Sequence, residues 1–186
     1  MPPRVKITKE DIIKCSLEII RTHGAQAFNA RTVAAELKCS TQPIFSNFDA
    51  MADLSNEVLR RAYDLYSSYL EKEAQEGKYP RYKSFGMAYI RFAKEERELF
   101  KLLFMRDRTG EEFKPTADFS ESTRLIASAN RISQEVAELI HLEMWSSVHG
   151  IGVMLATSYL ELDEELISRM LTDIYQGLCS AHKTEG

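Results

Sequence analysis

Histidine and cysteine are the residue types in this chain best suited to nucleophilic or metal chemistry. The chain holds His23, His141, His149 and His182, together with Cys15, Cys39 and Cys179. Their positions lack the close spacing of a zinc site, and Glu138 with His141 on one helix face is too small a set to hold a metal. The sequence also lacks a nucleophile elbow, an HExxH pair, a phosphate-binding loop and a dinucleotide fingerprint. We therefore predict no enzyme activity, no metal site and no cofactor.

Cysteine usage and hydropathy indicate the compartment. Three dispersed cysteines without paired spacing are typical of a reduced environment, where they are buried thiols. The basic residues near the N-terminus are not followed by an apolar run, and no stretch approaches the 18 or more uncharged apolar residues of a membrane span. We expect a cytoplasmic protein with no membrane partner.

Polar side chains suited to hydrogen bonding with nucleic acid gather at residues 40–47. They follow a short predicted helix and a turn formed by Lys38, Cys39 and Ser40. Two short helices joined in this way are typical of a helix-turn-helix, whose second helix enters the major groove. Helical bundles that bind no DNA share this pattern, so the spacing alone leaves the function open.

Local signals predict the elements that position these residues. Thr8 and Asp11 have the form of a capping box ahead of a helix over about 9–23. Asn29, Ser40 and Asp49 are predicted to cap the next three helices, over about 30–38, 41–48 and 50–75. Pro43 is compatible with the third helix because a proline in the first turn lacks only an N–H that would be unpaired there.

The rest of the chain also has helical spacing and no strand-like alternation. Apolar residues recur at helical intervals through 85–92 and 99–104, and a polar stretch over 106–115 is predicted to be a loop. Further helices are expected over about 118–129, 134–160 and 164–181, the last two capped by Ser133 and Asp163. The chain is therefore predicted to be all-α, with about nine helices.

Charge is unevenly distributed along the chain. The net charge is −4, but residues 1–48 carry +3 and the remainder carries −7. A mildly basic N-terminal part on an acidic remainder is the arrangement expected of a DNA-facing module joined to a protein-facing one.

Residues 12–24 and 31–48 resemble the first helix and the helix-turn-helix of TetR family regulators, with no insertion, and residues 49–54 continue into that family's long fourth helix. The resemblance implies a DNA-binding domain over 1–48 and a ligand-binding and dimerisation domain over 49–186. It also implies that double-stranded DNA is contacted by Arg31, Lys38, Ser40, Thr41, Gln42, Pro43, Phe45, Ser46 and Asn47. Arg4 and Lys6 are expected to add positive charge, and Phe48 to be core.

Four positions depart from the family pattern. Phe45 stands where many members have a tyrosine whose hydroxyl meets phosphate, and Met51 where many have a lysine. Asn47 often corresponds to histidine. Lys38 replaces the usual turn glycine, so a non-glycine residue is expected to adopt a positive φ. These departures weaken phosphate contacts, and we expect modest affinity for DNA.

Residues 89–104 and 145–150 resemble the C-terminal domain of a TetR subgroup marked by a Trp…His-Gly (WHG) signature. Aromatic residues there are predicted to line a pocket for a small apolar or amphipathic ligand: Phe85, Tyr89, Phe92, Phe100, Phe104, Trp145 and His149. Packing in the core or in the dimer interface is the competing interpretation of Trp145 and His149. The last two helices are expected to form a homodimer interface through Ile151, Leu155, Tyr159, Met170, Ile174 and Leu178.

These features predict a homodimeric repressor that binds a near-palindromic operator and is released by the ligand. The alternative is a helical adaptor that binds protein and whose N-terminal part no longer binds DNA. Affinity for duplex DNA and its dependence on salt separate the two.

Overall fold

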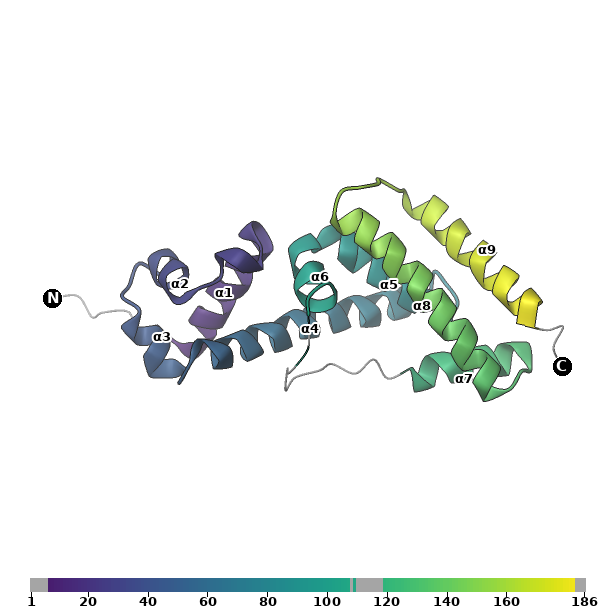
Figure 1. The fold of residues 1–186 in the computed structure, drawn as a ribbon, viewed down its shortest axis with the longest axis horizontal. Coiled ribbons are helices and arrows are strands. Elements are labelled where there is room, and N and C mark those ends of the chain that lie inside the picture. Colours follow the sequence, from purple (N-terminus) through teal and green to yellow (C-terminus); the bar gives the residue numbers. More distant parts are fainter. Residues whose placement is uncertain (1–6, 108, 110–118, 183–186) are drawn as a thin grey trace. The chain divides into compact units, whose positions relative to one another are not determined.

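The computed structural model describes residues 7–107, 109 and 119–182. Within these residues the chain forms nine α-helices, one 3-10 turn and no strand, so the predicted all-α fold is confirmed. The elements, shown in Figure 1, are α1 (Lys9–His23), η1 (Ala25–Ala27), α2 (Ala30–Glu36), α3 (Gln42–Asn47), α4 (Met51–Glu76), α5 (Arg81–Glu95), α6 (Arg97–Phe104), α7 (Ser120–Asn130), α8 (Gln134–Ala156) and α9 (Glu164–His182). No helix in the described part is long and apolar enough to cross a membrane.

The chain divides into two compact units. The first, which we call the head, comprises Met1–Leu65 and Glu96–Lys114, and the second, the body, comprises Tyr66–Glu95 and Pro115–Gly186. The long helix α4 therefore begins in the head and ends in the body, and α6 belongs to the head although it follows α5 of the body. The functional boundary expected after residue 48 stays a prediction.

The head is built around the apolar faces of its short helices. Ile12 and Ile20 of α1 are at most 1% exposed, and they pack with equally buried residues of α2, α3 and α6, namely Val33, Ile44, Leu99 and Phe100. Ser16, on the buried face of α1, satisfies its hydroxyl by donating to the Ile12 carbonyl. This core fixes α3 against α1.

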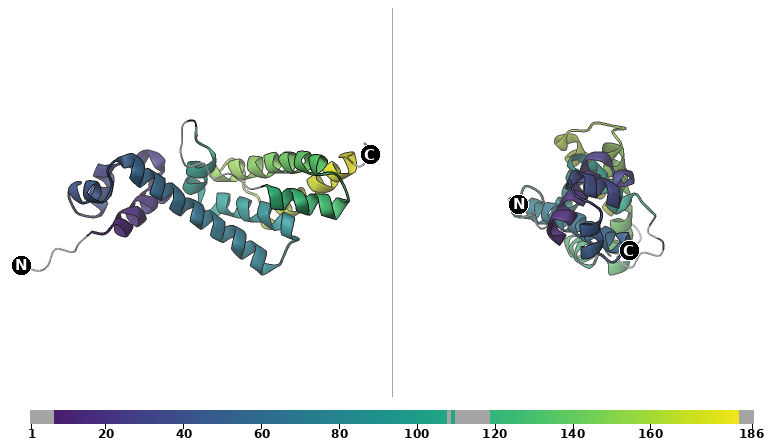
Figure 2. Two further views of the ribbon diagram at one scale, coloured as in Figure 1. Left: turned by 90° about the horizontal axis from the view of Figure 1, so that it is seen from below. Right: turned by 90° about the vertical axis from the view of Figure 1, so that its left-hand side faces the viewer.

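The body is a bundle in which α8 is the central helix. It packs against α5, α7 and α9, and Figures 1 and 2 show α8 and α9 side by side. The core of the bundle contains Phe92, Ile126, Ile140 and Leu155, each at most 2% exposed. The body's own helices α5, α7 and α9 therefore cover most of the surface of α8.

Most helix starts follow the predicted caps. The Thr8–Asp11 capping box is present, Asn29 accepts the N–H groups of Arg31 and Thr32, and Ser133 accepts that of Val136. Asp163 accepts the N–H of Leu166 at the start of α9.

Two predicted caps are wrong. Helix α3 starts after Thr41 rather than Ser40, because the Thr41 carbonyl accepts the N–H groups of Ile44 and Phe45 and so closes the first turn. Helix α4 starts after Ala50 rather than Asp49, because its first turn closes on the Ala50 carbonyl. The Asp53 carboxylate accepts the Ala50 N–H there.

The end of α8 also differs from the prediction. The helix ends at Ala156, where it was expected to continue to residue 160. Ser158 adopts a φ of 58°, and its N–H and that of Tyr159 donate to the carbonyls of Leu155 and Met154. This left-handed closure stops the helix, although the apolar pattern continues through Tyr159 and Leu160.

Candidate functional site

The turn between α2 and α3 is held by a Schellman closure. Lys38 has a φ of 53°, its N–H donates to the Ala35 carbonyl at 3.0 Å, and the Cys39 N–H donates to the Ala34 carbonyl at 2.9 Å. These two bonds satisfy the last carbonyls of α2 and reverse the chain, which is what places α3 directly after α2. The positive φ expected at Lys38 is confirmed.

Two buried side chains set which face of α3 points outward. Ile44 is 0% exposed and Phe48, just after the helix, is 4% exposed, so Phe48 belongs to the core as predicted. The opposite face carries Gln42, Phe45 and Ser46, which are all exposed. Half of the Phe45 side chain is in contact with solvent. A six-residue helix thus presents outward a hydrogen-bonding side chain next to an exposed aromatic ring.

The remaining predicted DNA-contact residues flank this exposed face. Ser40 and Asn47 are exposed, while Thr41 and Pro43 are half-buried. The Ser46 hydroxyl donates to the Gln42 carbonyl at 2.9 Å, and the Asn47 amide donates to the Pro43 carbonyl at 2.7 Å. Both polar side chains are folded onto their own helix, and reaching a phosphate would require them to leave these bonds.

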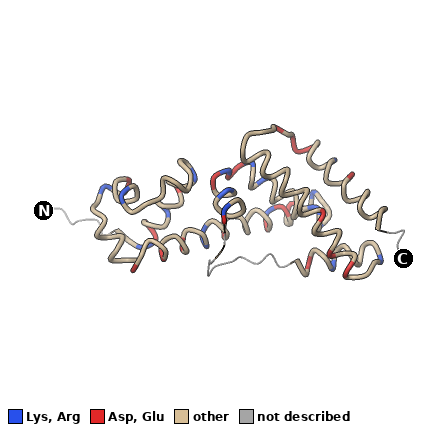
Figure 3. Tube along the Cα trace, viewed as in Figure 1, with Lys and Arg blue, Asp and Glu red and all other residues tan. Residues whose placement is uncertain are grey.

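The head has both paired and unpaired cations. Most of its described basic residues pair with a carboxylate: Lys9, Lys14, Arg21, Arg60, Arg61 and Lys101. Arg31 and Lys38 are exposed and form no ion pair with any residue of 7–107 or 119–182. Figure 3 marks the charged positions along the chain. These two cations lie on α2 and in the turn before α3, and Arg4 and Lys6 lie outside the described residues.

In the body, two tyrosine–histidine hydrogen bonds join α5 to α8. Tyr82 Oη lies 2.9 Å from His141 Nδ1, and Tyr89 Oη lies 2.8 Å from His149 Nδ1. Burial raises the pKa of both tyrosines and lowers the pKa of both histidines. Above about pH 6.5 the imidazoles are therefore neutral, and where the buried tyrosine hydroxyl is the donor, Nδ1 is the acceptor. The ring proton of each histidine is then on Nε2.

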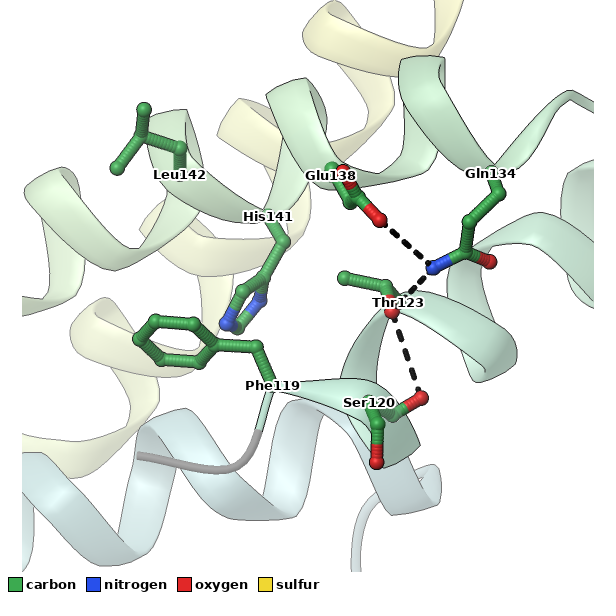
Figure 4. A pocket seen from close by; sticks show the side chains of 7 residues that line it. All are labelled: Phe119, Ser120, Thr123, Gln134, Glu138, His141 and Leu142. Atoms are coloured by element: carbon green, nitrogen blue, oxygen red, sulfur yellow. Dashed lines mark hydrogen bonds between the residues drawn. The ribbon is translucent and has the colours of Figure 1, made fainter. Parts of the chain in front are cut away.

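A hollow of about 430 Å³ opens beside the first of these pairs, between α7 and α8. It is lined by Phe119, Ser120, Thr123, Gln134, Glu138, His141 and Leu142. Figure 4 shows the His141 ring pointing from α8 toward Phe119, whose ring centroid lies 4.6 Å away in an edge-to-face arrangement. The Gln134 amide donates to Thr123 Oγ1 at 2.6 Å and to Glu138 at 3.3 Å, so the far side of the hollow is polar.

None of the seven predicted pocket residues lines this hollow. Phe100 and Phe104 belong to the head and the other five belong to the body. Trp145 and His149 share a helix face as expected, with their rings stacked at a centroid distance of 5.3 Å and an interplanar angle of 12°. The predicted pocket stays a prediction. The spacing of Glu138 and His141 predicted that both lie on one helix face, but it gave no sign that they border a hollow.

The predicted dimer residues fall into two groups. Ile151 and Leu155 are buried in the body's own core. Tyr159 is exposed, and Met170, Ile174 and Leu178 are half-buried. These four therefore have side-chain surface available to a partner. Ile151 and Leu155 would not touch a partner and could only support the interface by packing beneath it.

The described residues give little support for a metal site or a reactive thiol. No group of three histidine, cysteine or acidic side chains that could hold a metal occurs in the described parts of the chain. The three cysteines are free thiols, with Cys179 buried and the other two half-buried. Burial raises the pKa of the Cys15 thiol, which disfavours the reactive thiolate.

Comparison with known protein families finds a match that includes most of the body of the chain. Residues 82–174, which make up half of the chain, match the family model described as "Tetracyclin repressor-like, C-terminal domain". No curated protein matches the chain in sequence. The matched range runs from α5 into α9 and includes both tyrosine–histidine pairs and the hollow.

Proposed function

Because the chain belongs to the tetracyclin repressor-like (TetR) family, we propose that it is a dimeric transcriptional repressor that binds an operator through α3 and is released by a small molecule. The observation that carries the proposal is the exposed face of α3 next to two cations, Arg31 and Lys38, that have no carboxylate partner in the described chain. Unpaired cations beside an exposed helix are suited to the phosphates that flank a major groove.

Within that interface the side chains would have different tasks. Gln42, exposed at the first position of α3, carries an amide suited to bidentate hydrogen bonding with adenine. Pro43 next to it offers an apolar edge for a thymine methyl group. Arg31 and Lys38 would contribute affinity without sequence information, because phosphate contacts position a protein on DNA and base contacts specify the site.

An exposed apolar row on α8 and α9 supports the dimer. On α8 it includes the exposed Leu139 and the half-buried Val153, and on α9 it includes the exposed Leu166 and the half-buried Met170 and Ile174. Gly150 and Gly177 lie on the same faces, and a Cβ atom built on either glycine would meet nothing within 4 Å. Glycine inside a helix costs about 1 kcal/mol relative to alanine, so open space at two such positions suits the close approach of a partner's helices.

Dimerisation would set the spacing of the two heads. Recognition helices about 34–36 Å apart fit successive major grooves of a near-palindromic site. A ligand bound in the body would act on the head through the points where the chain passes between the units, which include Leu65–Tyr66 within α4 and Glu95–Glu96. It would lower operator affinity if it favoured a body arrangement in which the heads leave that spacing.

The test is a fluorescence-anisotropy titration against a duplex from upstream of the protein's own gene and a scrambled duplex, at two salt concentrations. We expect selective binding and a loss of selectivity in Gln42→Ala, because the discriminating contact is removed. Phe45→Tyr should raise affinity for both duplexes several-fold, since it adds a hydroxyl that can reach phosphate.

Charge provides the matched control. Arg31→Ala should weaken binding to both duplexes and lower the slope of log affinity against log salt by about 1. Lys14→Ala removes the same charge from a residue that already pairs with Glu10, and should change binding little. The adaptor alternative is favoured by the exposed phenyl ring of Phe45; equal weak binding of both duplexes, unaffected by Arg31→Ala, would support it.

A further inference from the structure

We propose that the hollow between α7 and α8 is the effector site, and that its ligand is a flat aromatic molecule, uncharged or cationic, with a hydrogen-bond acceptor held by Nε2 of His141. This inference rests on the proposed function, because it names the class of ligand that would release the repressor. It is carried by a buried donor, an aromatic wall and a carboxylate placed around one cavity.

The donor is the best-defined part of the site. His141 Nε2 is buried and has no hydrogen-bond partner in the described residues, although a buried N–H without a partner costs about 1–3 kcal/mol. The Tyr82 hydroxyl occupies Nδ1, which fixes the tautomer and leaves Nε2 as the N–H. His141 is one of the residues that line the hollow, and a turn of its ring toward the hollow would let an acceptor on a bound molecule satisfy this N–H.

The wall around the donor is aromatic and apolar. Phe119 is 41% exposed and Leu142 is 57% exposed, both unusually open for large apolar side chains. Trp145 does not line the hollow but supports its wall from outside, with its ring centroid 6.4 Å from that of Phe119. A volume of about 430 Å³ falls within the range of small-molecule sites and suits a molecule of two or three fused rings. Covering this surface with a flat ring would bury apolar area that the chain itself leaves exposed.

The opposite side of the hollow selects against anions. Glu138 lies one turn before His141 on α8, and one of its oxygens accepts the Gln134 amide. Gln134 also donates to Thr123 Oγ1, so this polar side is already ordered without a ligand. The Glu138 carboxylate would repel an aromatic acid and favour a ligand with no charge or with a positive one.

Three probes of the same shape separate these contributions. Quinoline has two fused rings with a nitrogen acceptor and is uncharged at about pH 8, naphthalene is the same shape without an acceptor, and 2-naphthoate adds a negative charge. Dissociation constants come from calorimetry, and the position of contact from the imidazole nitrogen resonances of His141. We expect quinoline to bind roughly three- to tenfold more tightly than naphthalene, as one net hydrogen bond would give, and 2-naphthoate to bind more weakly than either.

His141→Phe keeps a ring of similar size and removes the donor, so the preference for quinoline over naphthalene should disappear. His149→Phe is the matched control, because it also removes one tyrosine–histidine bond between α5 and α8 but lies outside the hollow. It should retain the preference. A preference that persists in His141→Phe, or 2-naphthoate binding as tightly as quinoline, would overturn the assignment of the ligand class.

Operator binding, measured without any probe, distinguishes this inference from the proposed function. If the protein binds its operator and quinoline lowers that affinity, both stand. If it binds its operator and saturating quinoline leaves the affinity unchanged, the hollow is not the effector site. If it binds no DNA but discriminates quinoline from naphthalene through His141, the repressor proposal fails while the ligand class stands.

Discussion

The Arg21 guanidinium donates to both carboxylate oxygens of Glu96, a residue 75 positions later in the chain and 4% exposed. The bond from Arg21 Nε to Glu96 is 2.7 Å long. Glu96 is the residue before α6, so this pair attaches the start of α6 to the last turn of α1 within the head. A carboxylate this deeply buried depends on the guanidinium for compensation of its charge.

We predict that Arg21→Ala lowers the free energy of unfolding by about 2 kcal/mol, because it leaves the Glu96 carboxylate buried without its partner. Urea denaturation followed by circular dichroism gives this quantity. Lys14→Ala, which breaks the exposed pair between Lys14 and Glu10, should cost less than about 0.5 kcal/mol. Equal losses in the two variants would show that the buried pair contributes no more to the free energy of unfolding than the exposed pair does.

Lys38 combines a conformational role with a charge, and substitution can separate them. Lys38→Gly should raise the free energy of unfolding by up to about 1 kcal/mol, since glycine adopts a φ near 53° without the steric cost that lysine has there. The same variant should bind DNA more weakly, because it loses a cation. Thermal unfolding and DNA titration of one protein sample measure both effects.

Lys38→Asn is the companion variant, since asparagine tolerates this region of φ but carries no charge. It should lose DNA affinity as Lys38→Gly does, while its stability stays near that of the parent. Loss of stability in Lys38→Gly would contradict the strain assigned to the turn.

Features decided within a few residues were predictable from the sequence. The capping box at Thr8 and Asp11 and the caps at Asn29 and Ser133 each depend on a side chain and a backbone N–H two or three positions away. The positive φ at Lys38 followed from its position in the family's turn. The end of α8 could not be predicted in this way. It depends on a left-handed conformation at Ser158, and this conformation is usually adopted by glycine rather than serine.

Features that depend on distant segments were not predictable. Tyr82 and His141 are 59 positions apart, and only the packing of α5 on α8 brings Nδ1 to the hydroxyl. The aromatic spacing suggested a pocket, but in the structure Phe92 and Phe100 are fully buried, as ordinary core residues are. A hydrophobic pattern identifies residues that leave water and does not say which of them border a cavity.

A dimer through α8 and α9 predicts that Gly177→Leu shifts the protein from dimer to monomer. Within one chain the substitution adds no clash at Cβ, because a Cβ at Gly177 meets nothing within 4 Å, and leucine is the better helix former. A partner helix packed against this face would be pushed away. Sedimentation velocity over a range of concentrations measures the dimer dissociation constant.

Gln176→Leu is the control for this experiment. Residue 176 is also exposed on α9 but points about 100° away from residue 177 around the helix. It should leave the dimer intact while adding the same apolar side chain. An unchanged dimer constant in Gly177→Leu would place the interface elsewhere.

Stability should fall as the pH drops below about 6.5, and His141 and His149 should cause part of that fall. Burial lowers the folded-state pKa of both below the ordinary value of 6.5. Their contribution is therefore complete above 6.5 and is lost as the pH falls toward the folded-state pKa, where protonation of Nδ1 also ends acceptance of the tyrosine O–H. Each histidine adds up to about 1.4 kcal/mol per pH unit in this window.

Glu73, whose pKa is raised by burial, changes stability with the opposite sign, but it is present in every variant and cancels in a difference. Urea denaturation between about pH 5 and pH 8 should thus give a smaller slope for His141→Phe with His149→Phe than for the parent, and identical slopes would mean that both imidazoles titrate as they do in water.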